Sequence, residues 1–338
     1  MKSKVVALAV AIASVACSVK AADHSYQVAR TFQIGGQGGW DYIMCDSPRH
    51  LLFVSRSTHV QVIDDETGKL VADIPGQHRN HGVAIAAAAG RGFISDSKDA
   101  CVYIFDLKTY NILGQVKVSE DADGILYDAG TNKVVVVCGD PGEMYAFPPD
   151  LDPQHGSAGE PAKLGTSVEY FACDGRGKAY VDLNAANQVG VVDLASMKVL
   201  AKWGVGSGGK PTGMAIDREH GRLFVGCRDP QKLVVLSTDG GKVLGEVPIG
   251  AGVDATVFDH GFAFASCHDG TLTVAGTAKD GSWTATQTVA TKPGARTLCV
   301  DSSTHAVYLP TAEFEKGGAR PASKANTFMI VEVKPNAG

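Results

Sequence analysis

Short apolar runs bounded by polar turn residues recur along the chain at a nearly constant spacing. Seven of them align: DYIMCD from Asp41, HGVAIA from His81, DGILYD from Asp123, EYFACD from Glu169, TGMAID from Thr212, DATVFD from Asp254 and RTLCVD from Arg296. Their starting points lie 40 to 46 residues apart, and six of the seven runs end in Asp. A period of this length predicts seven copies of one structural unit.

Each unit contains three further strand-like segments after its first apolar run. A second strand follows a short turn, as in RLFVG from Arg222, and a third ends at an acidic turn, as in VGVVDLASMK from Val189. A fourth leads to glycine, as in VLGEVPIG from Val243. Between the third and fourth strands, turns such as DETGK from Asp65 favour a hairpin, because Gly supplies positive φ. Four antiparallel strands repeated seven times predict an all-β fold, a seven-bladed β-propeller.

The two ends of the chain predict how the ring closes. The last unit supplies only three strands, at Arg296–Asp301, His305–Thr311 and Asn326–Val333, whereas an additional strand, Tyr26–Ile34, precedes the first unit. If this N-terminal strand completes the last blade, two exposed sheet edges are removed. We therefore expect closure by the N-terminal strand. A pair of β-sandwich domains is the structural alternative.

Two segments interrupt the repeat. Pro148–Gly165 is rich in Pro, Gly and Asp and predicts a long surface excursion in the third blade. Ala312–Asn326 lies between the second and third strands of the last unit. Loops of this length in a compact repeat are either functional or flexible, and the sequence does not choose between these interpretations.

The N-terminal segment has the features of a secretory signal. Lys2 and Lys4 precede the apolar run Val5–Ala16, and Val19 and Ala21 suit cleavage after Ala21. We predict a signal peptide at 1–21 and one propeller domain at 22–338, in a periplasmic or secreted protein. An N-terminal core helix and a lipoprotein acylated at Cys17 are the alternatives. No later stretch has 18 consecutive apolar residues, so the sequence predicts no transmembrane segment.

Composition narrows the classes of partner. Apolar residues make up 44% of the chain and charged residues 20%, which is typical of a globular protein. The formal net charge is −5, and cleavage after Ala21 removes three lysines and no acid, giving about −8. This acidic balance argues against nucleic acid or an anionic membrane as a partner.

With these motifs in place, the chain resembles the YncE-like, YVTN-repeat propellers of exported bacterial proteins. The resemblance extends from Tyr26 to Val333. It rests on VDATVFD at Val253, GARTLCVD at Gly294, VYLPTAEF at Val307, VIDDETGKLVADIPG at Val62 and KPTGMAID at Lys210. The eponymous Tyr-Val-Thr-Asn is absent, and the corresponding sites read FVSR, FISD, VVCG, YVDL, FVGC, FASC and YLPT. The resemblance implies the fold and leaves the function open, because propellers host binding, scaffolding and catalysis.

Propeller geometry places the first residue of each inner strand at the mouth of the central channel. These candidate ligand-binding residues are Asp41, His81, Asp123, Glu169, Thr212, Asp254 and Arg296. Six of the seven can carry charge, and neighbouring carboxylates repel one another unless a cation, an amine or a proton offsets them. Two interpretations stay open here: a mouth whose charges are screened by water, and a site for a ligand or a cation.

The loops between second and third strands open on the same face and carry mixed charges suited to a polar or zwitterionic partner. They present Arg56, His59, Asp96, Asp140, Asn184, Arg228, Asp229, His268, Asp269 and Glu313. Trp40, which follows the Gly-rich segment GGQGG, either forms an aromatic platform at the mouth or packs against a neighbouring blade.

Cysteine spacing and motif searches assign no chemistry. Seven cysteines follow the predicted leader, and neither CxxC nor CxxCH occurs, so a thioredoxin-type site and covalent haem are unsupported. We expect most of these cysteines to be small buried residues. GxSxG, HExxH, Walker A and EF-hand motifs are also absent, so we assign no catalytic residue and no metal ligand.

These observations favour an exported binding or interaction module with its site at the mouth face. The expected partner is a small polar or zwitterionic ligand, or a protein. The alternative, from a different functional class, is a lactonase- or lyase-type propeller enzyme that uses mouth carboxylates and His81 around a divalent cation. Such oxygen and imidazole ligands suit Ca²⁺, Mg²⁺ or Mn²⁺.

Overall fold

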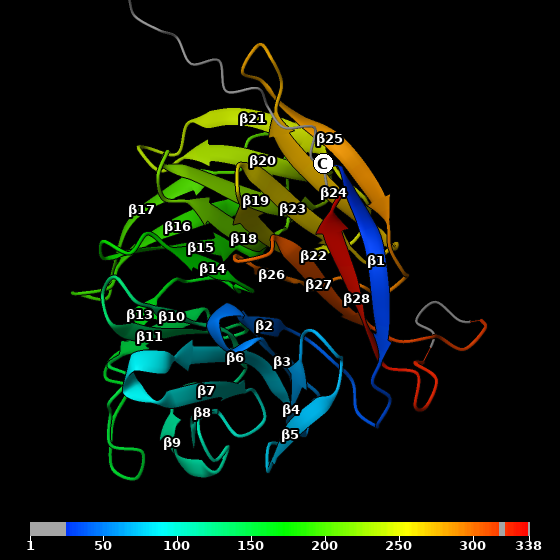
Figure 1. The fold of residues 1–338 in the computed structure, drawn as a ribbon. Coiled ribbons are helices and arrows are strands. Elements are labelled where there is room, and N and C mark those ends of the chain that lie inside the picture. Colours follow the sequence, from blue (N-terminus) through cyan, green and yellow to red (C-terminus); the bar gives the residue numbers. More distant parts are fainter. Residues whose placement is uncertain (1–24, 318–321, 337–338) are drawn as a thin grey trace, which may run out of the picture.

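A computed structural model describes residues 25–317 and 322–336, and its strands form seven sheets arranged in a ring (Figure 1). Every sheet has four strands, and all pairings are antiparallel. Helix in the described part of the chain is limited to three short 3₁₀ turns: η1 (Ser47–Arg49), η2 (Ala87–Ala89) and η3 (Asn184–Ala186). The prediction of a seven-bladed β-propeller is confirmed. The predicted leader, 1–21, lies outside the described residues.

The first four blades follow the chain in order, each beginning with its inner strand. Blade 1 comprises β2 (Ile43–Asp46), β3 (Leu51–Ser55), β4 (His59–Asp64) and β5 (Leu70–Pro75). Blade 2 comprises β6 (Asn80–Ala86), β7 (Arg91–Asp96), β8 (Cys101–Asp106) and β9 (Ile112–Lys117). Blade 3 comprises β10 (Ala122–Asp128), β11 (Lys133–Cys138), β12 (Glu143–Phe147) and β13 (Ala162–Lys163). Blade 4 comprises β14 (Phe171–Cys173), β15 (Lys178–Leu183), β16 (Gln188–Asp193) and β17 (Lys198–Gly204).

The last three blades complete the ring, and the final one uses both ends of the chain. Blade 5 comprises β18 (Pro211–Asp217), β19 (Arg222–Arg228), β20 (Gln231–Ser237) and β21 (Val243–Pro248). Blade 6 comprises β22 (Val253–Asp259), β23 (Phe262–Cys267), β24 (Thr271–Thr277) and β25 (Trp283–Ala290). Blade 7 comprises β26 (Cys299–Asp301), β27 (Ala306–Thr311), β28 (Met329–Pro335) and β1 (Tyr26–Gln33).

The N-terminal strand closes the ring as the sequence predicts. In Figure 1, β1 lies between β28 and β25, and it pairs antiparallel with β28 from Tyr26 opposite Pro335 to Gln33 opposite Met329. Its Arg30 Nε donates a hydrogen bond of 2.5 Å to the fully buried side chain of Glu332. On the other side, the backbone of Tyr26 exchanges two hydrogen bonds of 2.7 Å with the Gln287 side chain of β25. The strand therefore joins blade 7 to blade 6.

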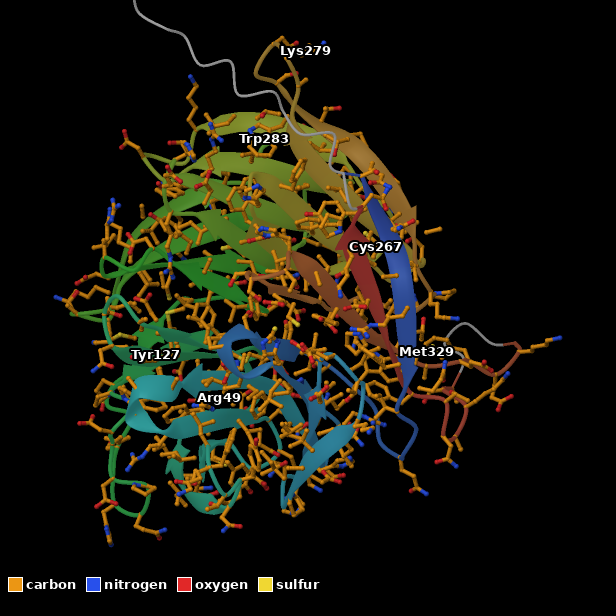
Figure 2. The ribbon with its side chains drawn as sticks, viewed as in Figure 1. Arg49, Tyr127, Cys267, Lys279, Trp283 and Met329 are labelled. Carbon is orange, nitrogen blue, oxygen red and sulfur yellow. The ribbon has the colours of Figure 1, made fainter. Side chains whose placement is uncertain are left out.

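The hydrophobic core lies between adjacent blades, because each cluster of buried apolar residues joins the side chains of two neighbouring sheets. Figure 2 shows the side chains on the ribbon, with Trp283 among those labelled. Between blades 5 and 6, the Phe224 ring stacks on Phe258 at 4.9 Å between centroids and meets Trp283 edge-on at the same distance. Such offset and edge-to-face pairs are the favoured aromatic geometries. Because each blade is covered on both faces, its strands read as nearly continuous apolar runs in the sequence.

The repeated Asp at the end of the inner strand is a turn residue on the face opposite the mouth. The carboxylate of Asp217 accepts hydrogen bonds from the backbone N–H groups of Glu219 and His220, each at 3.1 Å. Asp301 accepts in the same way from the Ser303 N–H at 2.9 Å. Asp is suited to this position because its side chain bonds the backbone two or three residues ahead.

The two interruptions of the repeat have distinct positions. Pro148–Gly165 contains the short outer strand β13 and reaches blade 2, where the Gln115 N–H donates to the Pro153 carbonyl at 2.9 Å. Ala312–Asn326 connects β27 to β28, and within its described residues Phe314 and Ser323 form an isolated antiparallel bridge. The first segment therefore bridges two blades at the outside of the ring.

Candidate functional site: the channel mouth

The mouth residues lie where the inner strands begin, and irregular pairing sets their direction. His81, Asp123, Thr212 and Asp254 are the second residues of β6, β10, β18 and β22, and the strand register shifts at each of these positions. Such bulges bend a strand and re-aim its side chains. The other three candidates, Asp41, Glu169 and Arg296, come two or three residues before β2, β14 and β26.

Glycine after the mouth residue allows neighbouring inner strands to approach closely. A Cβ atom at Gly82, which follows His81, would lie 2.8 Å from Cγ2 of Ile125 in the next blade. A Cβ atom at Gly124, which follows Asp123, would lie 2.8 Å from Cδ2 of Tyr170. A side chain has no room at either position. The close approach of neighbouring inner strands therefore requires glycine after His81 and after Asp123.

Acidic and basic groups from blades 1, 2 and 3 meet on one side of the mouth. His81 Nδ1 lies 2.6 Å from Asp41 Oδ2 and 3.4 Å from Asp123 Oδ1. Burial by itself lowers the pKa of His81, but the hydrogen bond to Asp41 and the charges of Asp123 and Asp41 outweigh it and raise the pKa to about 9. The imidazole is therefore cationic at neutral pH in the free protein.

Two arginines complete the arc on the other side. Arg296 lies 2.9 Å from Asp254 and 3.7 Å from Asp41. Arg228, at the end of β19, contacts Asp254 and lies 3.9 Å from Glu169. Burial raises the pKa of Asp254, although the two arginines oppose this shift.

Opposite charges consequently alternate around the mouth. The order is Glu169, Arg228, Asp254, Arg296, Asp41, His81 and Asp123. Blade 5 contributes Arg228 to this arc instead of the predicted Thr212. Thr212 is fully buried, and its hydroxyl donates to the Lys210 carbonyl at 3.1 Å and accepts from Asn184 Nδ2 at 3.4 Å. The structure thus brings six of the seven predicted residues into one charge network.

Acidic and basic residues cannot alternate completely around a ring of seven. Here two acids, Asp123 and Glu169, follow one another without a base between them. These two acids come from adjacent blades with no base between them in the order above. Burial raises the pKa of both carboxyls, and the charge of Glu169 raises that of Asp123 further. The arc thus contains four acids and three bases, so one acid is left without a basic partner of its own.

Two tyrosines form the floor of the mouth. Tyr42 and Tyr170 follow Asp41 and Glu169 in the chain, and their rings meet across the channel at 4.9 Å between centroids. Burial raises the pKa of Tyr170 to about 12, so the phenol stays neutral. Sequence reasoning missed this floor, although DYIMCD and EYFACD both place Tyr directly after the mouth acid.

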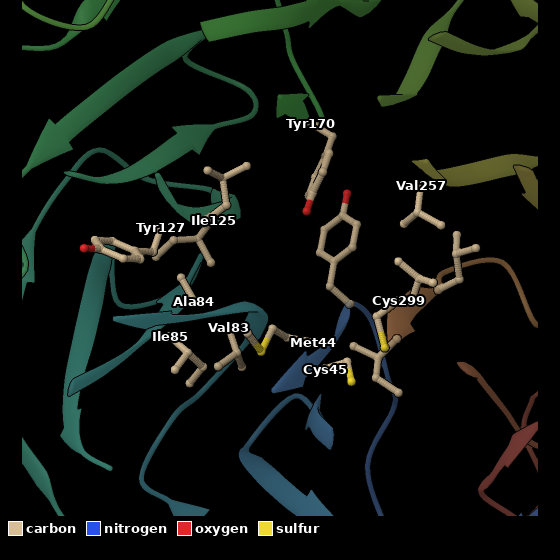
Figure 3. A pocket seen from close by; sticks show the side chains of 15 residues that line it. Met44, Cys45, Val83, Ala84, Ile85, Ile125, Tyr127, Tyr170, Val257 and Cys299 are labelled. Carbon is tan, nitrogen blue, oxygen red and sulfur yellow. The ribbon is translucent and has the colours of Figure 1, made fainter. Parts of the chain in front are cut away.

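Below the floor, the inner strands line an open pocket of about 270 Å³, and most of its lining side chains are apolar. Figure 3 shows Val83, Ile125, Val257 and Cys299 around it, with Tyr170 at one end. The polar groups of the mouth and this pocket therefore form two compartments of the same channel.

Some residues predicted at the rim are internal. Arg56 is fully buried and donates hydrogen bonds to the carbonyls of the Gly-rich segment, including those of Gln37 at 3.0 Å and Gly39 at 3.0 Å. Burial lowers its pKa to about 10, so it stays charged. Asp96 is likewise buried and accepts from backbone N–H groups. Trp40 packs near Phe328, at 5.9 Å between ring centroids, rather than forming a platform.

The mouth also contains the best-placed metal-binding atoms. Within residues 25–317 and 322–336, Asp41, His81 and Asp123 form the one group of three or more His, Cys, Asp or Glu residues whose donor atoms all lie within 4.8 Å of one another. The seven described cysteines are free thiols, and burial raises the pKa of Cys101 and Cys227 to about 12.

The fold and this site define a seven-bladed β-propeller with a charged channel mouth. A solved structure of Kuenenia stuttgartiensis hydrazine synthase is similar, with a TM-score of 0.69 and 12% sequence identity over 82% of this chain and 94% of that chain. At this identity the similarity shows the fold alone. No family model and no curated protein sequence matches the chain. In the described part of the chain, no helix has the length and apolarity needed to cross a membrane.

Proposed function

We propose that this protein is an exported binding module that holds a small polar ligand at the channel mouth through a cationic group. The observation that carries the proposal is the break in charge alternation between Asp123 and Glu169. A cation placed there meets two carboxylates whose pKa values are raised by burial, and it relieves the repulsion between them. A primary amine supplies both the charge and the hydrogen-bond donors.

The surroundings favour a ligand that also carries a negative end. Arg228 lies beside Glu169, and its side chain is 35% exposed, so part of the guanidinium is available to a carboxylate. The tyrosine floor keeps a ligand in the shallow polar compartment. A zwitterion fits this pattern, and so does a Lys side chain presented by a protein partner.

The experiment titrates the mature protein with putrescine, lysine, glycine and succinate, using isothermal calorimetry and native mass spectrometry. We expect an amine-bearing compound to bind at the mouth and succinate to bind at least tenfold more weakly. Glu169→Gln should weaken amine binding tenfold or more, which corresponds to about 1.4 kcal/mol.

Asp239→Asn is the matched control, because it makes the same charge change at an exposed turn between β20 and β21. Its amine affinity should equal that of the wild type. If none of the amines binds, or if Glu169→Gln and Asp239→Asn bind them equally well, the mouth is a solvated surface and the proposal is wrong.

Membership of the YncE-like, YVTN-repeat group is also part of the proposal. The repeat motifs at Val253, Gly294 and Val307 support it, together with the seven-bladed fold. Export is proposed from the N-terminal pattern, with a periplasmic or secreted mature protein.

A metal-dependent lactonase or lyase is the second candidate function. The specific observation in its favour is the convergence of Asp41, His81 and Asp123, since a divalent ion held there would polarise a bound carbonyl. A panel of lactones tested with Mn²⁺ present checks this candidate. Turnover that disappears in His81→Gln would support an enzyme, and absence of turnover would leave the binding module.

A further inference from the structure

We propose that the mouth binds one divalent cation between Asp41, His81 and Asp123, through His81 Nδ1 and one oxygen of each carboxylate. The inference rests on the proposed binding function of the mouth and names an inorganic ion as an occupant. It concerns the side of the mouth formed by blades 1, 2 and 3, and it shares Asp123 with the amine position proposed between Asp123 and Glu169.

The distances from His81 Nδ1 to the two carboxylate oxygens are close to those between neighbouring ligand atoms of one metal ion. Metal–ligand distances of about 2.1 Å put neighbouring ligand atoms of an octahedral ion about 3.0 Å apart. His81 Nδ1 lies 2.6 Å from the Asp41 oxygen and 3.4 Å from the Asp123 oxygen, on either side of that value. All three donor atoms lie within 4.8 Å of one another, and the three ligands come from three adjacent inner strands or their approaches.

The second ring nitrogen of His81 is held by groups outside this cluster. Nε2 lies 3.0 Å from Ser97 Oγ, which lies 3.2 Å from the Arg79 carbonyl. Because that carbonyl only accepts, the Ser97 hydroxyl donates to it and accepts from the imidazole Nε2–H. One ring proton is thus assigned to Nε2, so a metal ion that displaces the proton on Nδ1 meets the lone pair of that nitrogen. Metal-binding histidines usually have their other ring nitrogen fixed in this way.

The charges around the mouth favour an additional positive charge at this position. Asp41 and Asp123 face His81 directly, Glu169 lies beyond Asp123, and Arg79 is the nearby cation that opposes binding. A divalent ion held by these three side chains adds positive charge to an arc that contains four acids and three bases. The contacts of Arg228 and Arg296 with Asp254 lie outside this cluster and can stay as they are.

The donor set indicates the class of ion. Two carboxylates and one imidazole suit first-row divalent ions such as Mn²⁺ or Zn²⁺ better than thiolate-seeking Cu⁺. Three protein ligands leave coordination positions for water or for a ligand entering from the mouth.

The test uses the mature full-length protein, stripped with a chelator, dialysed and titrated with Mn²⁺. Electron paramagnetic resonance counts bound ions, and pulsed measurements detect coupling to an imidazole ¹⁴N. We expect one saturable ion per chain with nitrogen coupling. His81→Gln should remove the coupling and weaken binding at least tenfold, and Asp123→Asn should weaken it at least tenfold. Ser97→Ala should weaken binding about tenfold while keeping the coupling.

His220→Gln is the matched control, because His220 forms a similar pair with Asp217 at 2.9 Å on the opposite face. It should bind Mn²⁺ like the wild type. Absence of saturable binding, binding without nitrogen coupling, or equal binding by His81→Gln and His220→Gln overturns the inference. If His81→Gln does not fold, as judged by circular dichroism, two other results test the metal site. Nitrogen coupling in the wild type and weaker Mn²⁺ binding by Asp123→Asn support the site, and the absence of either contradicts it.

This outcome is separable from that of the proposed function. Amine binding that depends on Glu169, without Mn²⁺ binding, refutes the metal site alone. Mn²⁺ binding without any amine binding refutes the organic ligand alone.

Discussion

At the scale of single residues, acidic side chains at the mouth and at the far end of the inner strands lie in different environments. At the mouth, burial raises the pKa of Asp123 and Glu169, so their ionised forms are costly without a cation. At the opposite end, burial would raise the pKa of Asp301 too, but hydrogen bonds from Thr304 and Ser303 outweigh it and lower the pKa to about 2. Ionised carboxylates are therefore disfavoured by burial at Asp123 and Glu169, whereas hydrogen bonds stabilise the ionised carboxylate of Asp301.

Asp301→Asn tests the structural role of the repeated Asp. Because the folded pKa lies below the unfolded value of about 3.9, the carboxylate stabilises the fold above pH 4, and this contribution is lost as pH falls towards 2. We expect the variant to lose on the order of 2 kcal/mol at pH 7 and the difference from wild type to shrink between pH 4 and pH 2.

Urea unfolding at pH 7, 4 and 3 measures this difference. The exposed Asp239→Asn serves as control and should stay within about 0.5 kcal/mol of the wild type throughout. A pH-independent difference between Asp301→Asn and the wild type would contradict the explanation.

At the scale of elements, β1 joins the two ends of the chain within one blade, where it pairs with β28. Tyr26 and Phe32 bury their rings against different interblade clusters, and Arg30 pairs with the buried Glu332. The strand thus contributes packing, ladder hydrogen bonds and a partner for a buried charge. Without it, β28 becomes an exposed edge.

Deletion of Tyr26–Gln33 should therefore cost at least about 3 kcal/mol, from the two aromatic side chains alone. The melting temperature should fall by roughly 6 °C or more. Differential scanning calorimetry makes the comparison. The control is Val28→Thr, which alters an exposed side chain of β1 and keeps the strand. Melting of the deletion variant within a degree or two of the control would mean that β1 does not secure the ring.

At the scale of the whole molecule, seven blades place an odd number of positions around one mouth. An alternating arc of seven residues forms three acid–base pairs and leaves one acid over, and the two acids that adjoin without a base between them are Asp123 and Glu169. The symmetry of the fold thus creates the electrostatic feature on which the proposed binding depends.

Export is a prediction at the same scale. We expect a mature N-terminus at Ala22, because the run Val5–Ala16 is preceded by lysines and followed by Val19 and Ala21. Intact mass and N-terminal sequencing of protein expressed with its full N-terminal segment measure this directly. An acylated N-terminus at Cys17 would instead indicate a membrane-anchored lipoprotein, and an uncleaved Met1 would contradict export.

The sequence alone was enough for the number of blades, the four-strand order and the closing strand. These features depend on local sequence patterns. Apolar runs such as DGILYD and turns such as DETGK recur from blade to blade, and each copy predicts the same four-stranded unit. Six of the mouth residues could be found for the same reason, since one repeat position maps to one place in a ring.

Only the tertiary structure decided which side chains meet. Arg228 replaces Thr212 in the charge arc because its long side chain reaches Asp254 in the next blade, a contact that no spacing within blade 5 encodes. Arg56 turns inward to the Gly-rich segment instead of joining the rim, and Tyr42 meets Tyr170 from across the channel. Periodicity determines where a backbone position lies, but side-chain length and direction determine its partners, and these depend on neighbouring blades distant in the chain.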